Sequence, residues 1–411
     1  MNRRLGVVTA TLLSFFVLAG ALAGPGSATA PGKNGRLLVT VSHDEGFSSR
    51  ATMGPTGGGV TELEMGQVFG YGPTWAADGK AVISSGRGPD GLGGSTEGVY
   101  SAPVAGGDPE LLWDLSATSS YVSGPAIQSP DGRFLAMSHF EVEYPRDGPE
   151  RWASENGIYV KATSPGAGPP GRLDLGELGS PRGPVFSPDG RRMAFISQRF
   201  LNSAIMEIHT VRPDGTGLKL VTDAVNRVDY LSFSPDGRRL AFNQGSDIYS
   251  INLDGTGLKR LTATNSSTRP VYSPDGETIA FVRYGDPDEP SNSDIWFMDA
   301  DGGDTRQITS GPGEDWVDDW TRSAPFVFRK FNSRRSLAVV RVFGPGKLTV
   351  SGRHVTKAVK TTEGTRTVGL RVTPRANVRL KAGAQVKLKV RFAPKGGLPS
   401  TIEKTIRLGG R

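Results

Sequence analysis

The stretch that decides the fold is residues 232–262, SFSPDGRRLAFNQGSDIYSINLDGTGLKRLT. Residues 234–237 (Ser-Pro-Asp-Gly) predict a tight turn, because Pro presets φ and Gly accepts a positive φ. The segments around this turn predict four short strands: the apolar run ending at Phe233, residues 240–242, the alternating residues 247–253, and residues 258–262. One such four-stranded unit cannot bury both of its faces. If the unit repeats, its copies must therefore stack on each other.

The same turn, followed by a short apolar strand, recurs along the chain. Ser-Pro-Asp-Gly begins again at Ser129, Ser187 and Ser273, and a weaker copy, Ala-Ala-Asp-Gly, begins at Ala76. The aspartates of the five turns are spaced by 53, 58, 47 and 39 residues. Propeller blades repeat at roughly 40–50 residues, and loops of variable length widen this range. The spacing therefore favours a β-propeller.

The two ends of the repeat region supply one further copy in two halves. Residues 34–39 (Asn-Gly-Arg-Leu-Leu-Val) match the second half of the unit, and residues 318–321 (Asp-Asp-Trp-Thr) match the first half. Pairing these segments would close a ring and leave only short, protected sheet edges. Five whole copies and one split copy predict an all-β fold, a six-bladed β-propeller over residues 31–323.

A second β domain is predicted over residues 324–411, where the repeat stops. Residues 386–392 (Val-Lys-Leu-Lys-Val-Arg-Phe) alternate strictly between apolar residues and cations, which is typical of a sheet with one solvated face. Four other segments resemble strands: residues 337–342, 347–351, 368–372 and 401–408. Five or more strands in so short a segment predict a small immunoglobulin-like β-sandwich.

The charge of the chain is divided between the two predicted domains. Residues 326–411 carry 21 Lys and Arg against two acidic residues, a net charge of +19, whereas residues 1–325 carry 27 basic and 39 acidic residues. An acidic propeller is therefore joined to a strongly basic domain. Alternation places most of these cations on a solvated sheet face, and such a face is either only solvated or binds an anionic polymer or lipid surface.

The N-terminal residues 1–30 predict a secretory signal peptide. Arg3 and Arg4 precede an apolar run over residues 5–23, and small-x-small cleavage sites end at Ala23 and Ala30. The alternative is an uncleaved anchor, because the run approaches the roughly 20 residues that span a membrane. The chain has no cysteine, so an exported fold must depend on a large hydrophobic core instead of disulfides.

The repeat resembles a known family in several parts at once. The Ser-Pro-Asp-Gly turn, the Asp-Ile-Tyr and Asp-Ile-Trp strands at Asp247 and Asp294, and the closing Leu-Thr at residues 261–262 resemble the WD40-like repeats of the TolB family. The resemblance covers residues 31–323. It implies a six-bladed propeller that binds proteins in the cell envelope. Some TolB-like propellers also resemble oligogalacturonate lyase, so a metal-dependent glycan lyase is the alternative.

Candidate binding residues lie on the face of the propeller opposite the recurring turns. Loop length varies on this face, and loops on a rigid scaffold often carry function. Arginines on this face could bind a carboxylate of a partner protein or of a sugar acid, or they could form ion pairs with neighbouring aspartates. Aromatic side chains suit a protein or glycan contact. The predicted partner-binding residues are Tyr71, Tyr121, Tyr144, Trp152, Arg182, Arg227, Asp229, Arg269, Trp316 and Asp318.

Catalytic chemistry has little support in the sequence. A lyase needs a metal-binding histidine cluster, and only His43 and His139 fall at nearly equivalent points of two blades. No Gly-x-Ser-x-Gly segment is present, which argues against a serine hydrolase. We expect no catalytic residues, no metal, no cofactor and no nucleic-acid partner. The sequence predicts a secreted or periplasmic monomer that serves as a binding scaffold of the cell envelope.

Overall fold

The structure is a computed structural model of the chain, and it describes most of the protein after the predicted signal peptide. The described residues are 32–42, 48–64, 69–89, 95–115, 124–139, 157–198, 205–222, 225–285, 292–324, 326–333, 335–343, 345–364, 366–376, 378, 383–395 and 399–408. The predicted signal peptide lies outside this set. Within it, no helix is long and apolar enough to cross a membrane.

The unit first recognised in the sequence folds as one antiparallel sheet. Its strands are β17 (Val228–Phe233), β18 (Arg239–Gln244), β19 (Asp247–Asn252) and β20 (Lys259–Arg260), in that order. The Ser234 hydroxyl donates to Asp236 Oδ1 over 2.6 Å and accepts from the Arg239 amide over 2.9 Å. The side chains of the turn thus satisfy its backbone, and the predicted unit is confirmed.

Five further four-stranded arrays repeat this plan among the described residues. One joins the chain ends in the order β25 (Trp316–Ala324), β1 (Lys33–Ser42), β2 (Ser48–Met53) and β3 (Thr61–Glu62). In the other four sheets the strands follow chain order. Two of these sheets contain β4 (Phe69–Trp75), β5 (Ala81–Pro89), β6 (Ser95–Pro103) and β7 (Glu110–Asp114), and β8 (Ile127–Gln128), β9 (Phe134–His139), β10 (Gly157–Ala162) and β11 (Gly171–Arg172). The other two contain β12 (Gly179–Phe186), β13 (Met193–Gln198), β14 (Ile205–Val211) and β15 (Lys219–Leu220), with β16 (Val225–Asn226) beside β14, and β21 (Ser267–Tyr272), β22 (Thr278–Tyr284), β23 (Ser293–Asp299) and β24 (Arg306–Gln307).

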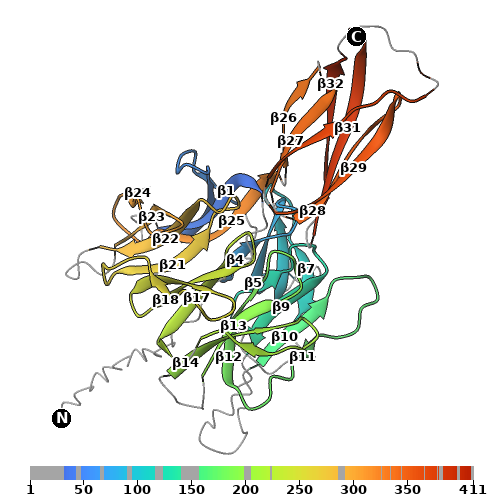
Figure 1. Ribbon diagram of the computed structural model, residues 1–411. Helices are drawn as coiled ribbons and strands as arrows, with labels where there is room; N and C mark the ends of the chain where they lie inside the picture. Colours follow the sequence, from blue (N-terminus) through green and yellow to red (C-terminus); the bar gives the residue numbers. More distant parts are fainter. Residues whose placement is uncertain are drawn as a thin grey trace, which may run out of the picture.

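The six sheets form a closed ring (Figure 1). The first strand of each sheet contacts the first strand of the next, in the cycle β4, β8, β12, β17, β21, β25 and back to β4. Strand β1 pairs antiparallel with β25, and Leu37 lies opposite Trp320. The predicted six-bladed propeller and its split blade are therefore confirmed.

The hydrophobic core of the propeller lies between neighbouring blades. One buried cluster combines Val271, Ala280 and Phe297 of one blade with Leu37 and Trp320 of the split blade. The rings of Phe297 and Trp320 stack with centroids 5.2 Å apart, and the Trp320 indole N–H donates to the Gly35 carbonyl over 3.2 Å. Ring closure is therefore part of the core and not only a backbone pairing.

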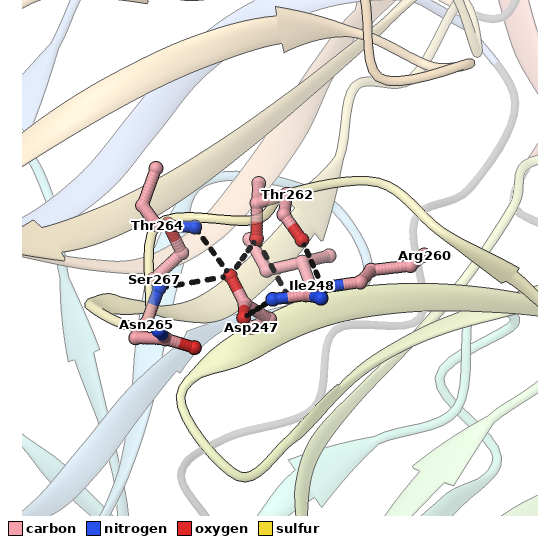
Figure 2. A network of polar contacts seen from close by, with 7 residues as sticks. All are labelled: Asp247, Ile248, Arg260, Thr262, Thr264, Asn265 and Ser267. Atoms are coloured by element: carbon pink, nitrogen blue, oxygen red, sulfur yellow. Dashed lines mark hydrogen bonds and ion pairs between the residues drawn. The ribbon is translucent and has the colours of Figure 1, made fainter.

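A polar network explains why Asp-Ile and Leu-Thr recur in the blades (Figure 2). The buried Asp247 carboxylate at the start of β19 accepts hydrogen bonds from Arg260 Nη2 over 2.5 Å, from Thr262 Oγ1 over 2.9 Å and from the Thr264 amide over 2.9 Å. Thr262 Oγ1 in turn accepts from the Ile248 amide over 2.9 Å. These bonds tie the outermost strand of the blade to β19. The recurring Asp-Ile and Leu-Thr pairs therefore serve to hold the strands of a blade together.

The C-terminal domain is a sandwich of two antiparallel sheets. One contains β26 (Phe326–Asn332), β27 (Leu337–Val342) and β30 (Arg366–Arg371), and the other contains β29 (Val355–Glu363), β28 (Pro345–Gly352), β31 (Gln385–Pro394) and β32 (Ser400–Arg407). Their inward side chains, among them Val340, Leu370 and Phe392, share one buried core. The immunoglobulin-like classification and the domain boundary at residue 324 stay predictions.

The sandwich contacts the propeller at the end that carries the Pro-Asp-Gly turns. Arg341 Nη2 lies 3.5 Å from Glu277 Oε1, which follows one of these turns. Lys395 lines a pocket of about 300 Å³ together with Pro188 and Pro235 of two other turns. The basic domain therefore lies at the end of the propeller that carries these turns (Figure 1).

Candidate functional site

The first strands of four blades share one backbone irregularity. In β4, β12, β17 and β21, the pairing register moves three residues along the first strand for every two along the neighbouring strand at one point. The extra residue forms a β-bulge in each of these four strands. The bulges lie between residues 71 and 74, 182 and 185, 229 and 232, and 268 and 271. Bulges turn side chains away from the regular pleat and are frequent beside functional sites. Four of the ten predicted binding residues lie in these bulges, namely Tyr71, Arg182, Asp229 and Arg269.

Two of the bulges contain large residues in a strained conformation. The equivalent position has a positive φ in all four strands, and it is occupied by Gly72 (42°), Gly183 (59°), Tyr230 (53°) and Arg269 (53°). Glycine adopts this left-handed conformation without cost, whereas other residues lose roughly 1–2 kcal/mol. Such strain is concentrated at functional sites. Tyr230 and Arg269 thus accept a backbone strain that two sister blades avoid with Gly, which marks these two positions as candidates for function.

The Arg269 side chain lies between two aromatic rings, an arrangement we call the arginine sandwich. The guanidinium carbon of Arg269 is 4.6 Å from the ring centroid of Tyr230 in β17 and 4.6 Å from that of Trp316 in β25. Three adjacent blades therefore contribute to one cation–π assembly. Arg269 Nε and Trp316 Nε1 are buried, and neither has a hydrogen-bond partner among the described residues. Arg269 and Trp316 are nevertheless both partly exposed, so a ligand can approach the exposed part of the assembly.

Acidic groups surround the arginine sandwich. Asp318 is only 2% exposed, and its Oδ2 accepts from the Thr40 hydroxyl over 2.7 Å. Burial raises the pKa of Asp318, although the nearby Arg50 and Arg269 oppose this effect. Burial also raises the pKa of Glu314, again opposed by Arg269. Asp318 and Glu314 are therefore both close enough to Arg269 to feel its charge.

Two further predicted arginines lie beside this cluster. Arg182 Nη2 is 3.5 Å from Asp229 Oδ1, and both side chains are mostly buried. Burial raises the pKa of Asp229, and the charges of Arg182 and Arg227 oppose this rise. Arg227 is exposed and has a positive φ of 53°. The structure thus pairs Arg182 with a neighbouring aspartate and leaves Arg227 at the surface.

The structure describes the remaining predicted binding residues only in part. Tyr71 lies in β4 opposite Ser85, but its side chain is outside the described set. Tyr121, Tyr144 and Trp152 all lie outside the described residues. The arginine sandwich, with Asp229 and Asp318, is therefore the part of the predicted site that the structure brings together.

The histidine pair weighed for a metal site is described at one position only. His139 is 4% exposed in β9, where its ring packs edge-on against Tyr159 at 5.5 Å. His43 lies outside the described residues. Among the residues that the structure does describe, no group of three or more His, Asp or Glu side chains is placed to hold a metal ion.

Sequence reasoning missed a buried row of polar groups in the β12–β15 blade. Ser197 Oγ lies 3.1 Å from His209 Nδ1, and His209 Nε2 lies 3.7 Å from Glu207 Oε2. Ser197 faces the blade interior and is 0% exposed, so a substrate cannot reach its hydroxyl. His209 also stacks on Phe195 at 5.6 Å. The sequence contained one sign of this row: His209 occupies the position in β14 that Tyr249 occupies in β19 of the next blade.

Acidification is expected to destabilise the propeller through His209. Burial lowers the pKa of His209 below 6.5, and the Glu207 carboxylate only partly opposes this effect. The unfolded chain therefore binds a proton more readily, and the stability contributed by neutral His209 is lost as pH falls below about 6.5. We expect the melting temperature to fall between pH 7.5 and pH 5, and to fall less in His209→Gln. Equal shifts in the two proteins, measured by circular dichroism, would exclude His209 as the cause.

Comparison with known proteins finds the same architecture. A family described as TolB beta propeller domain matches residues 180–324. An uncharacterized protein of Agrobacterium fabrum is 26% identical over 245 residues, which are 57% of this chain and 74% of that protein. A protein TolB homolog of Chlorobium luteolum is 31% identical over 133 residues, which are 30% of this chain and only 27% of that protein.

A solved structure extends the likeness beyond the matched segments. TolB from Acinetobacter baumannii superimposes with a TM-score of 0.53 and 15% identity, covering 70% of this chain and 67% of that chain. At this identity the likeness concerns the fold. Together with the six closed blades and the TolB propeller match, it identifies the repeat region of this chain as a TolB-like β-propeller.

Proposed function

We propose that the protein is a binding scaffold that holds an anionic group of a protein or glycan partner. The binding region, which we call the propeller mouth, is the surface around Tyr230, Arg269 and Trp316. The observation that carries this proposal is the arginine sandwich. Arg269 is held between Tyr230 and Trp316 in a strained bulge, and its side chain stays partly exposed. A guanidinium is a planar donor fork that matches a carboxylate, and aromatic faces fix its orientation.

The backbone strain at Tyr230 and Arg269 supports a binding role. A bulge built with Gly, as at Gly72 and Gly183, would preserve the strand geometry without left-handed strain. The chain instead places Tyr230 and Arg269 there. Arg269 is partly exposed, so a carboxylate of a partner can approach its guanidinium, and the charge-assisted hydrogen bonds would contribute to affinity.

The proposed location is the cell envelope. The N-terminal residues 1–30 have the pattern of a secretory signal, and the TolB-like propeller agrees with a role in binding envelope proteins. We further propose that the protein acts as a monomer and that the basic sandwich retains it on an anionic polymer. Among the described residues, no group of side chains supports a metal-dependent lyase more strongly than it supports this proposal.

Substitution of Arg269 is expected to abolish partner capture. Immobilised mature chain, residues 31–411, would be incubated with envelope extract, and the captured material would be quantified by mass spectrometry and uronic-acid assay. We expect Arg269→Gln to reduce specific capture by about tenfold or more, because it removes the charge and the stacked fork. Protease treatment of the extract distinguishes the two partner classes, since only glycan capture survives it.

Two matched variants give this experiment its control. Arg238→Gln removes an exposed arginine from a Pro-Asp-Gly turn at the opposite end of the propeller, and it should capture partners as the wild type does. Arg269→Gly should also lose capture, but its free energy of unfolding should stay within about 1 kcal/mol of wild type, because relief of the positive φ offsets the lost stacking. Wild-type capture by Arg269→Gln would refute the proposed site.

A further inference from the structure

The four-stranded sheet of the sandwich presents a cationic outer face. Strand β31 alternates between exposed and buried side chains along its length, and Lys387, Lys389 and Arg391 are exposed. Directly opposite residues in neighbouring antiparallel strands share a face. The register therefore places the following residues on this outer sheet face: Lys347, Thr349 and Ser351 of β28, Val359, Thr361 and Glu363 of β29, Gln385, Lys387, Lys389 and Arg391 of β31, and Thr401, Glu403, Thr405 and Arg407 of β32.

The charge of the outer sheet face is strongly unbalanced. It carries five cations, which are Lys347, Lys387, Lys389, Arg391 and Arg407, against two acidic residues, Glu363 and Glu403. Lys387 Nζ lies 3.3 Å from Glu403 Oε2, but both side chains are more than half exposed. An exposed ion pair of this kind contributes little to stability. The face is therefore available to an external polyanion.

The spacing of these cations suits a linear polymer. Residues two apart on one strand lie about 6.8 Å from each other, and neighbouring strands are about 4.8 Å apart. Lys387, Lys389 and Arg391 thus form a straight row, and the hydroxyls of Thr349, Ser351 and Thr401 lie alongside it. Lysine ammonium groups and hydroxyls donate to phosphate oxygens from several directions.

The composition of the face narrows the class of occupant. Single-stranded nucleic acids need aromatic side chains on which bases stack, and the outer sheet face has none. A membrane surface favours amphipathic aromatic or apolar anchors, and the only exposed apolar residue on this face is Val359. We propose that the outer sheet face binds a linear polyphosphodiester of the cell wall. This inference specifies the retention step of the proposed function, and it does not involve the propeller mouth.

The test uses the mature full-length chain and long-chain polyphosphate as the probe. Binding would be measured by fluorescence anisotropy at low and moderate salt. We expect the triple variant Lys387→Gln, Lys389→Gln, Arg391→Gln to bind at least about tenfold more weakly and to show a shallower salt dependence. Circular dichroism would verify that the variant is folded, which is expected because all three side chains are exposed.

A charge-matched control separates this face from net charge. The variant Lys330→Gln, Arg366→Gln, Arg371→Gln removes three exposed cations from the other sheet and should bind polyphosphate as the wild type does. Equal weakening in the two triple variants would overturn the proposal. So would tighter binding to single-stranded DNA or to phosphatidylglycerol vesicles than to polyphosphate. Arg269→Gln should leave polyphosphate binding unchanged, so failure at this face and failure at the propeller mouth are distinguishable.

Discussion

Replacement of Trp320 by alanine is expected to lower the free energy of unfolding of the propeller by about 4 kcal/mol. Trp320 is 2% exposed, stacks on Phe297 of the preceding blade and donates a hydrogen bond to Gly35 of the strand that closes the ring. The substitution leaves a cavity at the seam and an unpaired carbonyl on Gly35. No covalent bond joins the chain across this seam, so the pairing of β1 with β25 and the packing of side chains must together hold the split blade.

Urea denaturation followed by tryptophan fluorescence and circular dichroism would measure this effect. Leu258→Ala is the control, because Leu258 is 52% exposed and its removal should cost less than about 0.5 kcal/mol. Increased proteolysis within residues 32–42 in Trp320→Ala would locate the weakness at the seam. A loss below about 1 kcal/mol would show that pairing of β1 with β25 is sufficient for ring closure.

Replacement of Asp247 by alanine is expected to cost about 3 kcal/mol of unfolding free energy. The change removes the acceptor that Arg260, Thr262 and the Thr264 amide share (Figure 2). The Thr262 hydroxyl and the Thr264 amide would then lack their partner within a packed blade. Asp254→Ala, in an exposed turn of the same blade, should cause a clearly smaller loss.

The same carboxylate predicts how the stability of this blade depends on acid. Burial alone would raise the pKa of Asp247, but hydrogen bonds from Arg260, Thr262 and two backbone amides lower it below 3.8 overall. The ionised group therefore stabilises the fold above the unfolded pKa of about 3.9, and this contribution is lost as pH falls below it. Chemical denaturation at pH 6 and pH 3 should show a larger difference for wild type than for Asp247→Asn. An equal difference would contradict the assignment.

In the β17–β20 blade, the stabilising contacts and the proposed binding residue Tyr230 lie in different places. The recurring motifs, such as Asp247 with Thr262 and Ser234 with Asp236, satisfy polar groups and hold strands together. The bulges at Tyr230 and Arg269 instead contain strain and donors without partners among the described residues. Stabilising substitutions at such positions commonly reduce function. This is why Arg269→Gly is expected to separate capture from folding.

The sequence alone determined the architecture, because turns and strand alternation are local properties that every blade repeats. The Pro-Asp-Gly turns, their spacing and the two halves around Asn34 and Trp320 were sufficient to predict six blades and the closed ring. The cationic alternation of residues 386–392 likewise predicted a sheet with one charged face.

Only the tertiary structure decided which side chains meet. The sequence named Arg269, Trp316 and Asp318 as separate candidates, but it missed Tyr230, whose role depends on a bulge shared by neighbouring blades. It also missed the burial of Ser197 and His209 within one sheet. These contacts join residues of different strands and blades, and their geometry depends on strand register and blade packing. A one-dimensional pattern predicts that blades will stack, but the distances between their side chains exist only once the ring has closed.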